Sequence, residues 1–268
     1  MASWARPPGA AGANVARLYN VLMARTLLLI FAHPDDETFL AGGLSCRASS
    51  DGTRVVLATA TRGESGKAGD PPLCTPAELP AVREAELRRA AAILGIAELH
   101  LLGYRDRDLA AAPAERVRAQ LVGLIRAVRP SVVVTFDPHG ANLHPDHIAI
   151  SRFASDAVAA AADDRFQPGD RPAYAVPRLA WTPGRHPWQL VREPDIASCP
   201  GVDFAIDVSA WRDRKLAALR AHATQHRSVE RNFDSQPDRD RLLGFEAFRQ
   251  AFGPPLARRP LTDLFDGV

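Results

Sequence analysis

The residues of this chain best suited to chemistry lie in two short motifs that combine histidine with aspartate. Residues 32–37 read Ala-His-Pro-Asp-Asp-Glu, and residues 144–147 read His-Pro-Asp-His. Between them, His33, Asp36 and His147 supply two imidazoles and a carboxylate. A catalytic zinc usually takes three protein ligands of these types and keeps one coordination position open for water or substrate. The two motifs therefore predict one catalytic metal site.

The other side chains of the motifs would complete a hydrolytic site. Asp35 and Asp36 are neighbours, so their side chains tend to diverge, and one carboxylate can bind a metal while the other stays free. A free carboxylate can take a proton from water that a metal has acidified. His144 stands near an expected helix start, where it would either donate to a developing oxyanion or protonate a leaving amine. These groups favour metal-assisted hydrolysis of an amide.

Each motif follows an apolar run with the composition of a buried strand. Residues 27–31 read Leu-Leu-Leu-Ile-Phe, and residues 132–136 read Val-Val-Val-Thr-Phe. Ligands of open α/β sheets bind at the carboxyl ends of the strands. Two loops that leave two such strands at the same edge can assemble a site that neither loop makes alone.

The rest of the pattern alternates strands with helices and predicts an α/β, Rossmann-like fold with a mostly parallel, doubly wound sheet. The expected strands span 27–31, 54–60, 99–102, 131–136, 174–181 and 203–208. The expected helices span 37–49, 80–94, 113–128, 145–162 and 209–226. Ser209 would cap the last of these helices. Residues 63–80 form a Gly/Pro-rich loop, and the last forty residues show only a weak pattern.

The length of 268 residues, with 46% hydrophobic residues, is enough to bury the core of one α/β domain. We expect residues 1–25 to form a loose extension, with a short helix at 15–22, and a single domain to span 26–268. Within that domain, 26–165 would form the Rossmann-like metal-binding core, and 166–268 a smaller part that shapes the substrate site.

Composition argues against several other classes of protein. The net charge of +2 arises from 33 basic and 31 acidic residues without a basic block, so no nucleic-acid partner is expected. Cys46, Cys74 and Cys199 lack C-x-x-C spacing, which argues against a disulfide framework and favours a reducing compartment. The apolar run at 27–32 is too short to span a bilayer, and Pro-Pro-Gly at 7–9 breaks the region where a signal peptide would be apolar. We expect a cytoplasmic protein with no membrane partner.

A second pair of histidines, His222 and His226, has the i, i+4 spacing that suits zinc ligands on a helix. No glutamate follows His222, as the metalloprotease motif requires. We therefore expect His222 to pack in the core or lie near the site, and His226 to be exposed.

Two other functions would use similar residues. Non-haem iron oxygenases also bind their metal with two histidines and a carboxylate, but they typically use a β-sandwich and a His-x-Asp spacing, which are not found here. Residues 63–67 read Gly-Glu-Ser-Gly-Lys, but they lack the spacing of a phosphate-binding loop, and Ala68 stands where Ser or Thr is required. A non-catalytic Rossmann-like domain that binds a sugar or a nucleotide is the distant alternative.

The two motifs strongly resemble those of the LmbE/PIG-L-like deacetylases, zinc-dependent enzymes that remove the acetyl group from N-acetylglucosamine derivatives. The resemblance covers about residues 26–226. Further segments with similar residues are 42–43, 61–64, 66, 83–84, 86, 94–95, 102–106, 135–138 and 215–225, the last running from Lys215 through His222 to Gln225.

The resemblance implies a role for each site residue. His33, Asp36 and His147 would bind Zn²⁺, and Fe²⁺ suits the same ligands. Asp35 would be the general base, and His144, oriented by Asp146, would stabilise the tetrahedral intermediate. The residues implied to contact the sugar are Arg62, Glu64, Arg105 and Asp106.

The expected function is removal of the N-acetyl group from an N-acetylglucosamine-type sugar or conjugate. The expected partner is therefore a small-molecule amino sugar, and the sequence is also compatible with a homo-oligomer. The alternative within the same family is an amidase that cleaves a larger acyl group or a thiol conjugate.

Overall fold

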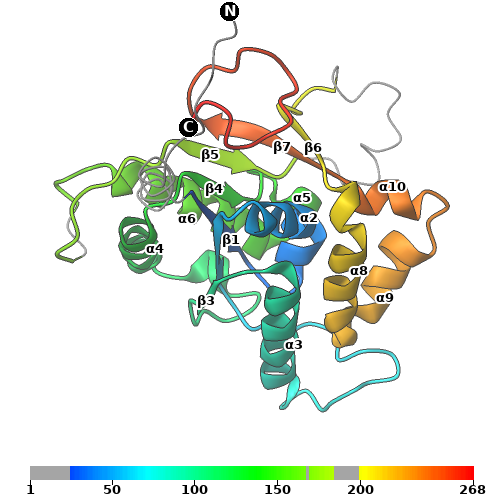
Figure 1. The fold of residues 1–268 in the computed structure, drawn as a ribbon. Coiled ribbons are helices and arrows are strands. Elements are labelled where there is room, and N and C mark those ends of the chain that lie inside the picture. Colours follow the sequence, from blue (N-terminus) through cyan, green and yellow to red (C-terminus); the bar gives the residue numbers. More distant parts are fainter. Residues whose placement is uncertain (1–24, 167–168, 184–198) are drawn as a thin grey trace, which may run out of the picture.

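The computed structural model describes residues 25–166, 169–183 and 199–268, and its centre is a seven-stranded sheet (Figure 1). The strand order is β3-β2-β1-β4-β5-β7-β6. The strands are β1 (Thr26–Phe31), β2 (Arg54–Thr59), β3 (Glu98–Leu101), β4 (Val132–Thr135), β5 (Arg178–Trp181), β6 (Phe204–Asp207) and β7 (Phe245–Phe252).

The directions of the strands confirm the predicted α/β class with a mostly parallel sheet. Strands β3, β2, β1, β4 and β5 run parallel to their neighbours. Strand β7 runs antiparallel to both β5 and β6. Residues 166–268 thus add three strands to the sheet that the first part of the chain begins.

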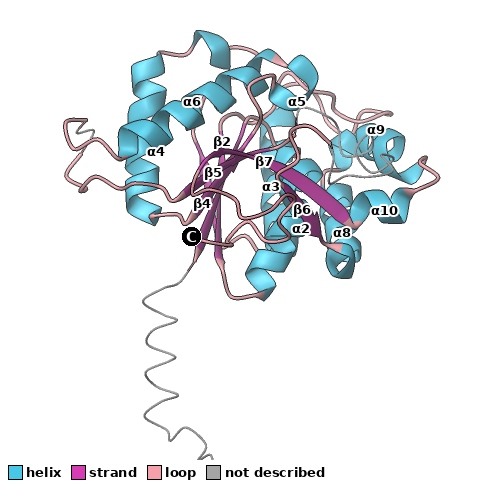
Figure 2. Ribbon diagram, turned by 90° about the horizontal axis from the view of Figure 1, so that it is seen from above, coloured by secondary structure: helices cyan, strands magenta, loops and turns pink. Residues whose placement is uncertain are grey.

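Helices cover both faces of this sheet, as a doubly wound fold requires. Helices α2 (Asp36–Ser50), α3 (Leu79–Leu94) and α8 (Arg212–Ala221) pack together on one face, whereas α4 (Ala114–Val128) and α6 (Pro145–Ala161) pack on the other (Figure 2). The shorter helical segments are η1 (Leu109–Ala111), α5 (Gly140–Leu143), η3 (Ser209–Trp211), η4 (Ala223–Gln225), α9 (His226–Val229), η5 (Glu230–Asp234) and α10 (Arg239–Leu243). No described helix is long and apolar enough to cross a membrane.

The two motifs meet because their strands are neighbours. Residues 27–29 of β1 pair with residues 132–134 of β4 in parallel register. The chain winds from β1 outward to β3 and then returns to β4, so the gap between β1 and β4 is the point where the winding reverses. Ligands bind at this point in doubly wound sheets. All six residues of β1 and all four of β4 are buried, which is why both strands read as unbroken apolar runs.

The expected helix over 209–226 is wrong, because the structure divides this segment into three parts. Ser209 opens a short 3-10 turn and does not cap α8, which begins at Arg212 and ends at Ala221. In a continuous helix the Thr224 N–H would donate to the carbonyl of residue 220. It donates instead to Glu86 Oε1 at 2.8 Å, so a tertiary contact replaces the helical hydrogen bond.

Other expectations differ from the structure in smaller ways. Strand β5 begins at Arg178, four residues after its expected start at Tyr174. Strand β7 was not predicted, because its eight residues alternate too weakly between apolar and polar types. The helix expected at 15–22 and most of the extension at 1–25 lie outside the described residues.

A buried ion pair fixes the kinked helix α2 to β7. Ala41 has a φ of −142°, and near this kink the N–H groups of Gly43 and Leu44 donate to Glu246 at 2.8 and 2.7 Å. Lys215 Nζ donates to the same carboxylate at 2.7 Å, and both side chains are almost completely buried. Glu246 therefore satisfies backbone donors of α2, while Lys215 balances its charge.

Replacing Lys215 by methionine should strongly destabilise the protein, because Glu246 would remain buried without its counter-charge. Loss of one partner of a buried pair typically costs about 3–5 kcal/mol. Urea unfolding should show this loss for Lys215→Met. The matched control is Arg88→Met, since Arg88 pairs with Glu84 on the surface of α3, and such pairs contribute about 1 kcal/mol or less. Equal losses of unfolding free energy in the two variants would contradict the structural role of the Lys215–Glu246 pair.

Candidate metal centre and active site

The first motif forms a tight turn at the end of β1, in which Asp35 has an unusual backbone conformation. Its φ of 107° lies in the region that L-residues rarely occupy, and α2 begins at the next residue. Such a conformation costs on the order of 1–3 kcal/mol and persists only where its surroundings hold it. Here the Asp35 N–H donates to Glu37 Oε2 at 3.0 Å, and Arg83 donates to the Pro34 carbonyl.

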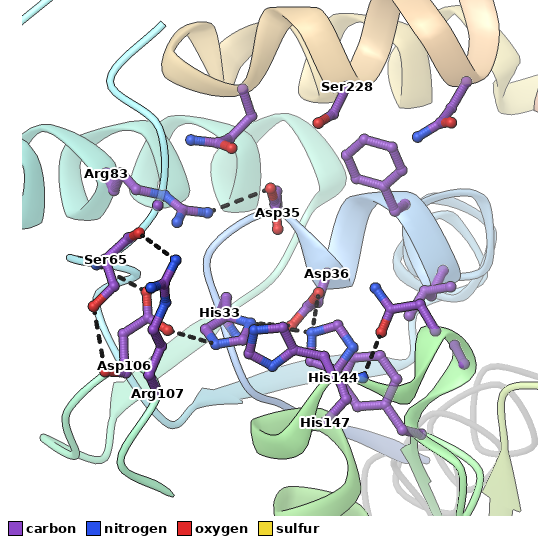
Figure 3. A pocket seen from close by; sticks show the side chains of 18 of the residues that line it. His33, Asp35, Asp36, Ser65, Arg83, Asp106, Arg107, His144, His147 and Ser228 are labelled. Carbon is purple, nitrogen blue, oxygen red and sulfur yellow. Dashed lines mark hydrogen bonds and ion pairs between the residues drawn. The ribbon is translucent and has the colours of Figure 1, made fainter.

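The structure brings the three predicted metal ligands, His33, Asp36 and His147, together at this turn (Figure 3). His33 Nδ1 lies 3.1 Å from His147 Nε2 and 3.7 Å from Asp36 Oδ2. His147 Nε2 lies 3.4 Å from Asp36 Oδ1. Ligand atoms at about 2.0–2.1 Å from a tetrahedral zinc lie roughly 3.3–3.4 Å from one another. The His33–His147 and His147–Asp36 separations are close to this spacing, whereas Asp36 Oδ2 lies farther from His33 Nδ1 and accepts the His33 backbone N–H at 2.7 Å.

The outer nitrogen of each imidazole has a partner that orients the ring. His33 Nε2 lies 3.1 Å from Asp106 Oδ1 and 3.2 Å from Asp146 Oδ2. His147 Nδ1 lies 3.1 Å from the Gly140 carbonyl, which accepts its hydrogen. Carboxylates and carbonyls placed behind metal-binding histidines fix the tautomer and raise the basicity of the ligand nitrogen. The inner nitrogens, His33 Nδ1 and His147 Nε2, are thereby left for a cation.

The electrostatics of the two imidazoles also suit a cation. Burial lowers the pKa of His33, but the hydrogen bonds to Asp106 and Asp146 and the charge of Asp36 outweigh it and raise the pKa to about 10. Burial, together with the charge of His33, lowers the pKa of His147 to about 4. The carboxylates around His33 therefore favour a positive charge at this position. A metal ion would supply that charge.

A second group of ligand types, Asp106 and Asp146, surrounds the other side of His33. These carboxylates already accept backbone hydrogens: Asp146 from Arg107 and Leu109, and Asp106 from Ser65. Asp146 is fully buried and does not line the pocket. Asp146 therefore supports His33 from behind, whereas Asp106 both contacts His33 and lines the cavity with Asp36.

Asp35 diverges from Asp36, as their adjacency predicted. Its Oδ2 lies 3.3 Å from Arg83 Nη2, and Arg83 is itself buried and donates to the Gly63 carbonyl at 2.9 Å. Burial raises the pKa of Asp35 to about 6, although the charge of Arg83 acts in the opposite direction. A pKa near neutrality suits a general base. A Cβ on Gly63 would lie 2.1 Å from Arg83 Nη1, so this glycine makes room for the guanidinium.

His144 lies at the start of α6, and the Asp146 N–H donates to its Nδ1 at 3.2 Å. The proton of the neutral ring is therefore on Nε2. Burial lowers the pKa of His144, with the charges of His33 and His147 adding to the effect, so the neutral form is favoured. The predicted orientation of His144 by Asp146 thus arises from the backbone of Asp146, while its carboxylate contacts His33.

These groups form the floor of a cavity of about 370 Å³. Its opposite wall comes from the C-terminal part of the chain, and Figure 3 shows Ser228 of this wall across the cavity from the imidazoles, with Asp35 between them. We call this wall the roof, and its residues are Gln225, Ser228, Arg231 and Asn232.

Only one of the four residues implied to contact the sugar, Asp106, lines the cavity. Arg62 pairs with Glu84 on the surface, and Arg105 pairs with Asp108. Glu64 accepts the Asp106 N–H and so supports the loop from behind. The structure therefore does not bring Arg62, Glu64 or Arg105 into the cavity.

Several cavity residues were not identified from the sequence. Arg107, which has a φ of 73°, lines the cavity in place of Arg105. Arg83 could have been identified from the spacing of residues in α3. It lies on the buried face of this helix with Leu79, Glu86 and Leu87, which is an unusual place for an arginine. The roof residues carried no signal, because no motif marks them.

The second histidine pair, His222 and His226, does not line this cavity. His222 is fully buried, with its Nε2 2.9 Å from Glu37 Oε1, so the expectation that it packs near the site is met. Burial raises the pKa of Glu37, but the charge of His222 outweighs it and lowers the pKa overall, and Glu37 raises that of His222 in turn. His226 is half-buried rather than exposed, because its ring nitrogens contact the carbonyls of Ala223 and Asp70.

The fold is that of an α/β protein whose two histidine motifs, with His33, Asp36 and His147, meet at the point where the sheet winding reverses. The family model "PIG-L: GlcNAc-PI de-N-acetylase" matches residues 28–158. A deacetylase of 1D-myo-inositol 2-acetamido-2-deoxy-alpha-D-glucopyranoside from Tsukamurella paurometabola is 38% identical over 256 residues, covering 76% of this chain and 84% of that protein. The enzyme of the same name from Thermobifida fusca is 36% identical and covers 90% of this chain and 99% of its own. The chain therefore belongs to the PIG-L (LmbE-like) family.

Solved structures share this fold. The conserved protein TT1542 from Thermus thermophilus has a TM-score of 0.66 at 30% identity, covering 86% of this chain and 96% of that one. N,N'-diacetylchitobiose deacetylase from Pyrococcus horikoshii has a TM-score of 0.67 at 22% identity, over 92% of this chain and 94% of that one, and shows a shared fold.

Metal binding should depend on both motifs and on the residues behind them. Asp36→Asn and His147→Gln each remove a ligand and should abolish stoichiometric zinc binding in equilibrium dialysis. Asp106→Asn weakens only the support of His33 and should lower zinc affinity about 10- to 100-fold. His100→Gln, on β3 and outside the cavity, is the control and should bind zinc normally. Unchanged affinity in Asp36→Asn would refute the ligand set.

Proposed function

We propose that this protein is a zinc-dependent N-deacetylase that releases acetate from an N-acetylglucosamine-type glycoside. The observation that carries the proposal is the set of three converging ligands, His33, Asp36 and His147, with the free carboxylate of Asp35 beside it on the same cavity floor. Zinc is the preferred ion because the ligand spacing is tetrahedral and the donors are nitrogen and oxygen, although ferrous iron accepts the same types of ligand.

The residues on the floor divide the reaction between them. A metal ion held by the three ligands would acidify a water molecule and polarise the acyl carbonyl. Asp35 takes a proton from the attacking water and, after the tetrahedral intermediate forms, delivers it to the leaving nitrogen. His144, with its proton on Nε2, donates to the oxyanion. Arg83 holds Asp35 in place from the side away from His147 (Figure 3).

The roof supports a substrate that carries a polyol on the sugar. Relatives of this chain are named as deacetylases of an inositol-linked glucosaminide. Ser228 and Asn232 line the cavity, and within the described part of the chain their side chains form no hydrogen bond to the protein. A hydroxyl and an amide one helical turn apart suit the hydroxyl groups of a second ring. We therefore propose N-acetylglucosaminyl-inositol, or a similar polyol glycoside, as the substrate.

Loss of Asp35 should abolish most turnover without loss of the metal. Asp35→Asn keeps the shape but not the basicity, so kcat should fall about 10²- to 10⁴-fold with zinc content unchanged. His144→Gln should lower kcat about 10²- to 10³-fold through loss of the oxyanion donor. His139→Gln lies in the same segment but outside the cavity, and should retain wild-type kcat. Acetate release, followed by a coupled assay, measures all three, and an active Asp35→Asn enzyme would exclude Asp35 as the base.

A comparison of substrates tests the proposed polyol. The wild-type enzyme should deacetylate N-acetylglucosaminyl-inositol with a higher kcat/KM than free N-acetylglucosamine. Asn232→Ala and Ser228→Ala should each lower kcat/KM for the inositol glycoside about 2- to 10-fold, since a neutral hydrogen bond contributes about 0.5–1.5 kcal/mol. The same variants should leave free N-acetylglucosamine unaffected. Equal losses on both substrates would place the roof outside the polyol site.

A further inference from the structure

The general base proposed above depends on a backbone conformation that needs support. Asp35 has a φ of 107°, and its N–H donates to Glu37 Oε2 at 3.0 Å. The carboxylate of Glu37 is fully buried and does not line the cavity. Its position two residues after Asp35 lets it hold the peptide that sets the direction of the Asp35 side chain.

Glu37 is itself held by a residue from the far end of the chain. Its Oε1 accepts from Thr38 Oγ1 at 2.5 Å and lies 2.9 Å from His222 Nε2. His222 is fully buried, and it sits in the break between α8 and η4, where the backbone leaves the helical conformation. The chain of contacts therefore runs from His222 through Glu37 to the Asp35 N–H.

His222 is not needed merely to attach the C-terminal part to the core. Other buried contacts do this on both sides of it: Lys215 pairs with Glu246, and Thr224 Oγ1 donates to Glu86 Oε2 at 2.6 Å. His222 is also not a metal ligand, since it does not line the cavity and its Nδ1 has no partner among the described residues. Among the described residues, its Nε2 lies 2.9 Å from Glu37 Oε1 and 3.4 Å from Thr38 Oγ1.

From this geometry we propose that His222 is a positioning residue for the reaction, which holds Asp35 in its strained conformation by orienting Glu37. The proposal rests on the deacetylase activity proposed above. Removing the His222 donor should let Glu37 turn away, so that Asp35 relaxes and its carboxylate no longer faces the attacking water.

The first test compares two substitutions at the same site. His222→Leu removes the donor, and kcat should fall about 10- to 100-fold with KM within about threefold and zinc content unchanged. His222→Gln places an amide N–H near the position of Nε2 and should recover most of the lost kcat. Should His222→Leu fail to fold, His222→Asn replaces it, because its amide is polar but too short to reach Glu37. An unchanged kcat in the folded variant would overturn the proposal.

A matched control separates positioning from general loss of stability. Thr224→Val removes the neighbouring contact to Glu86 but does not touch the chain that ends at Asp35. It should lower the urea midpoint while kcat stays within about twofold of the wild type. In the Asp35→Asn background, His222→Leu should lower kcat by less than about a further threefold. The effects of two substitutions on kcat do not add when one residue acts through the other. The proposal would be contradicted if the fold-loss in kcat of the double variant equalled the product of the losses in the two single variants.

Hydrogen–deuterium exchange tests the same inference without turnover. The peptide that spans 33–40 should exchange faster in His222→Leu than in the wild type, whereas Thr224→Val should leave it unchanged. Inactivity of the wild-type enzyme on every acetylated sugar would count against the proposed function and not against the positioning. If the wild-type enzyme is active and the 33–40 peptide of His222→Leu exchanges at the wild-type rate, the positioning role of His222 is wrong and the proposed function stands.

Discussion

The site depends on the parallel pairing of β1 with β4. The two motifs are far apart in the sequence, and only the pairing of residues 27–29 with 132–134 places their histidines at one edge of the sheet. A shift of either strand by one residue would turn every side chain of that strand to the opposite face of the sheet. The buried aliphatic side chains of both strands fix the register, so the packing of the core sets the 3.1 Å distance between His33 Nδ1 and His147 Nε2.

A second constraint follows from the charges gathered at this edge. Asp35, Asp36, Glu37, Asp106 and Asp146 lie within or just behind the site, and burial alone would raise the pKa of each of them. Each therefore has assigned donors, which are backbone N–H groups, an imidazole or the Arg83 guanidinium. This requirement explains why so many separate elements, including α3 and the turn after α8, converge on one short loop.

Much of the fold, and the meeting of His33, Asp36 and His147, followed from the sequence because local signals agreed with the tertiary structure. The segments 27–31 and 132–136 consist mostly of aliphatic and β-branched residues, which predicts buried strands. A histidine motif follows the carboxyl end of each segment, so the fold class and the candidate ligands could be predicted together. The helix over 209–226 could not, because its break at His222 depends on Glu37 and Glu86, which lie elsewhere in the chain. The same holds for the roof, where Ser228 and Asn232 line the cavity because of the position of α9 and the π-helical turn that follows it.

The contrast between Arg105 and Arg107 makes the same point at the level of one side chain. Both arginines stand in one short loop, and nothing in their sequence context separates them. Arg107 lines the cavity and donates to the Ser65 carbonyl at 3.3 Å, while Arg105 remains exposed beside Asp108. The folded loop, and not the sequence, distinguishes the two arginines.

The most direct test of the account is a stepwise removal of metal from the purified wild-type protein, with metal content and acetate release measured on the same samples. If His33, Asp36 and His147 form one catalytic centre, acetate release falls in proportion to the metal removed, extrapolates to about one ion per chain, and returns when zinc is restored. Full acetate release from metal-free protein would contradict the central claim that the two motifs form one metal-dependent hydrolytic site.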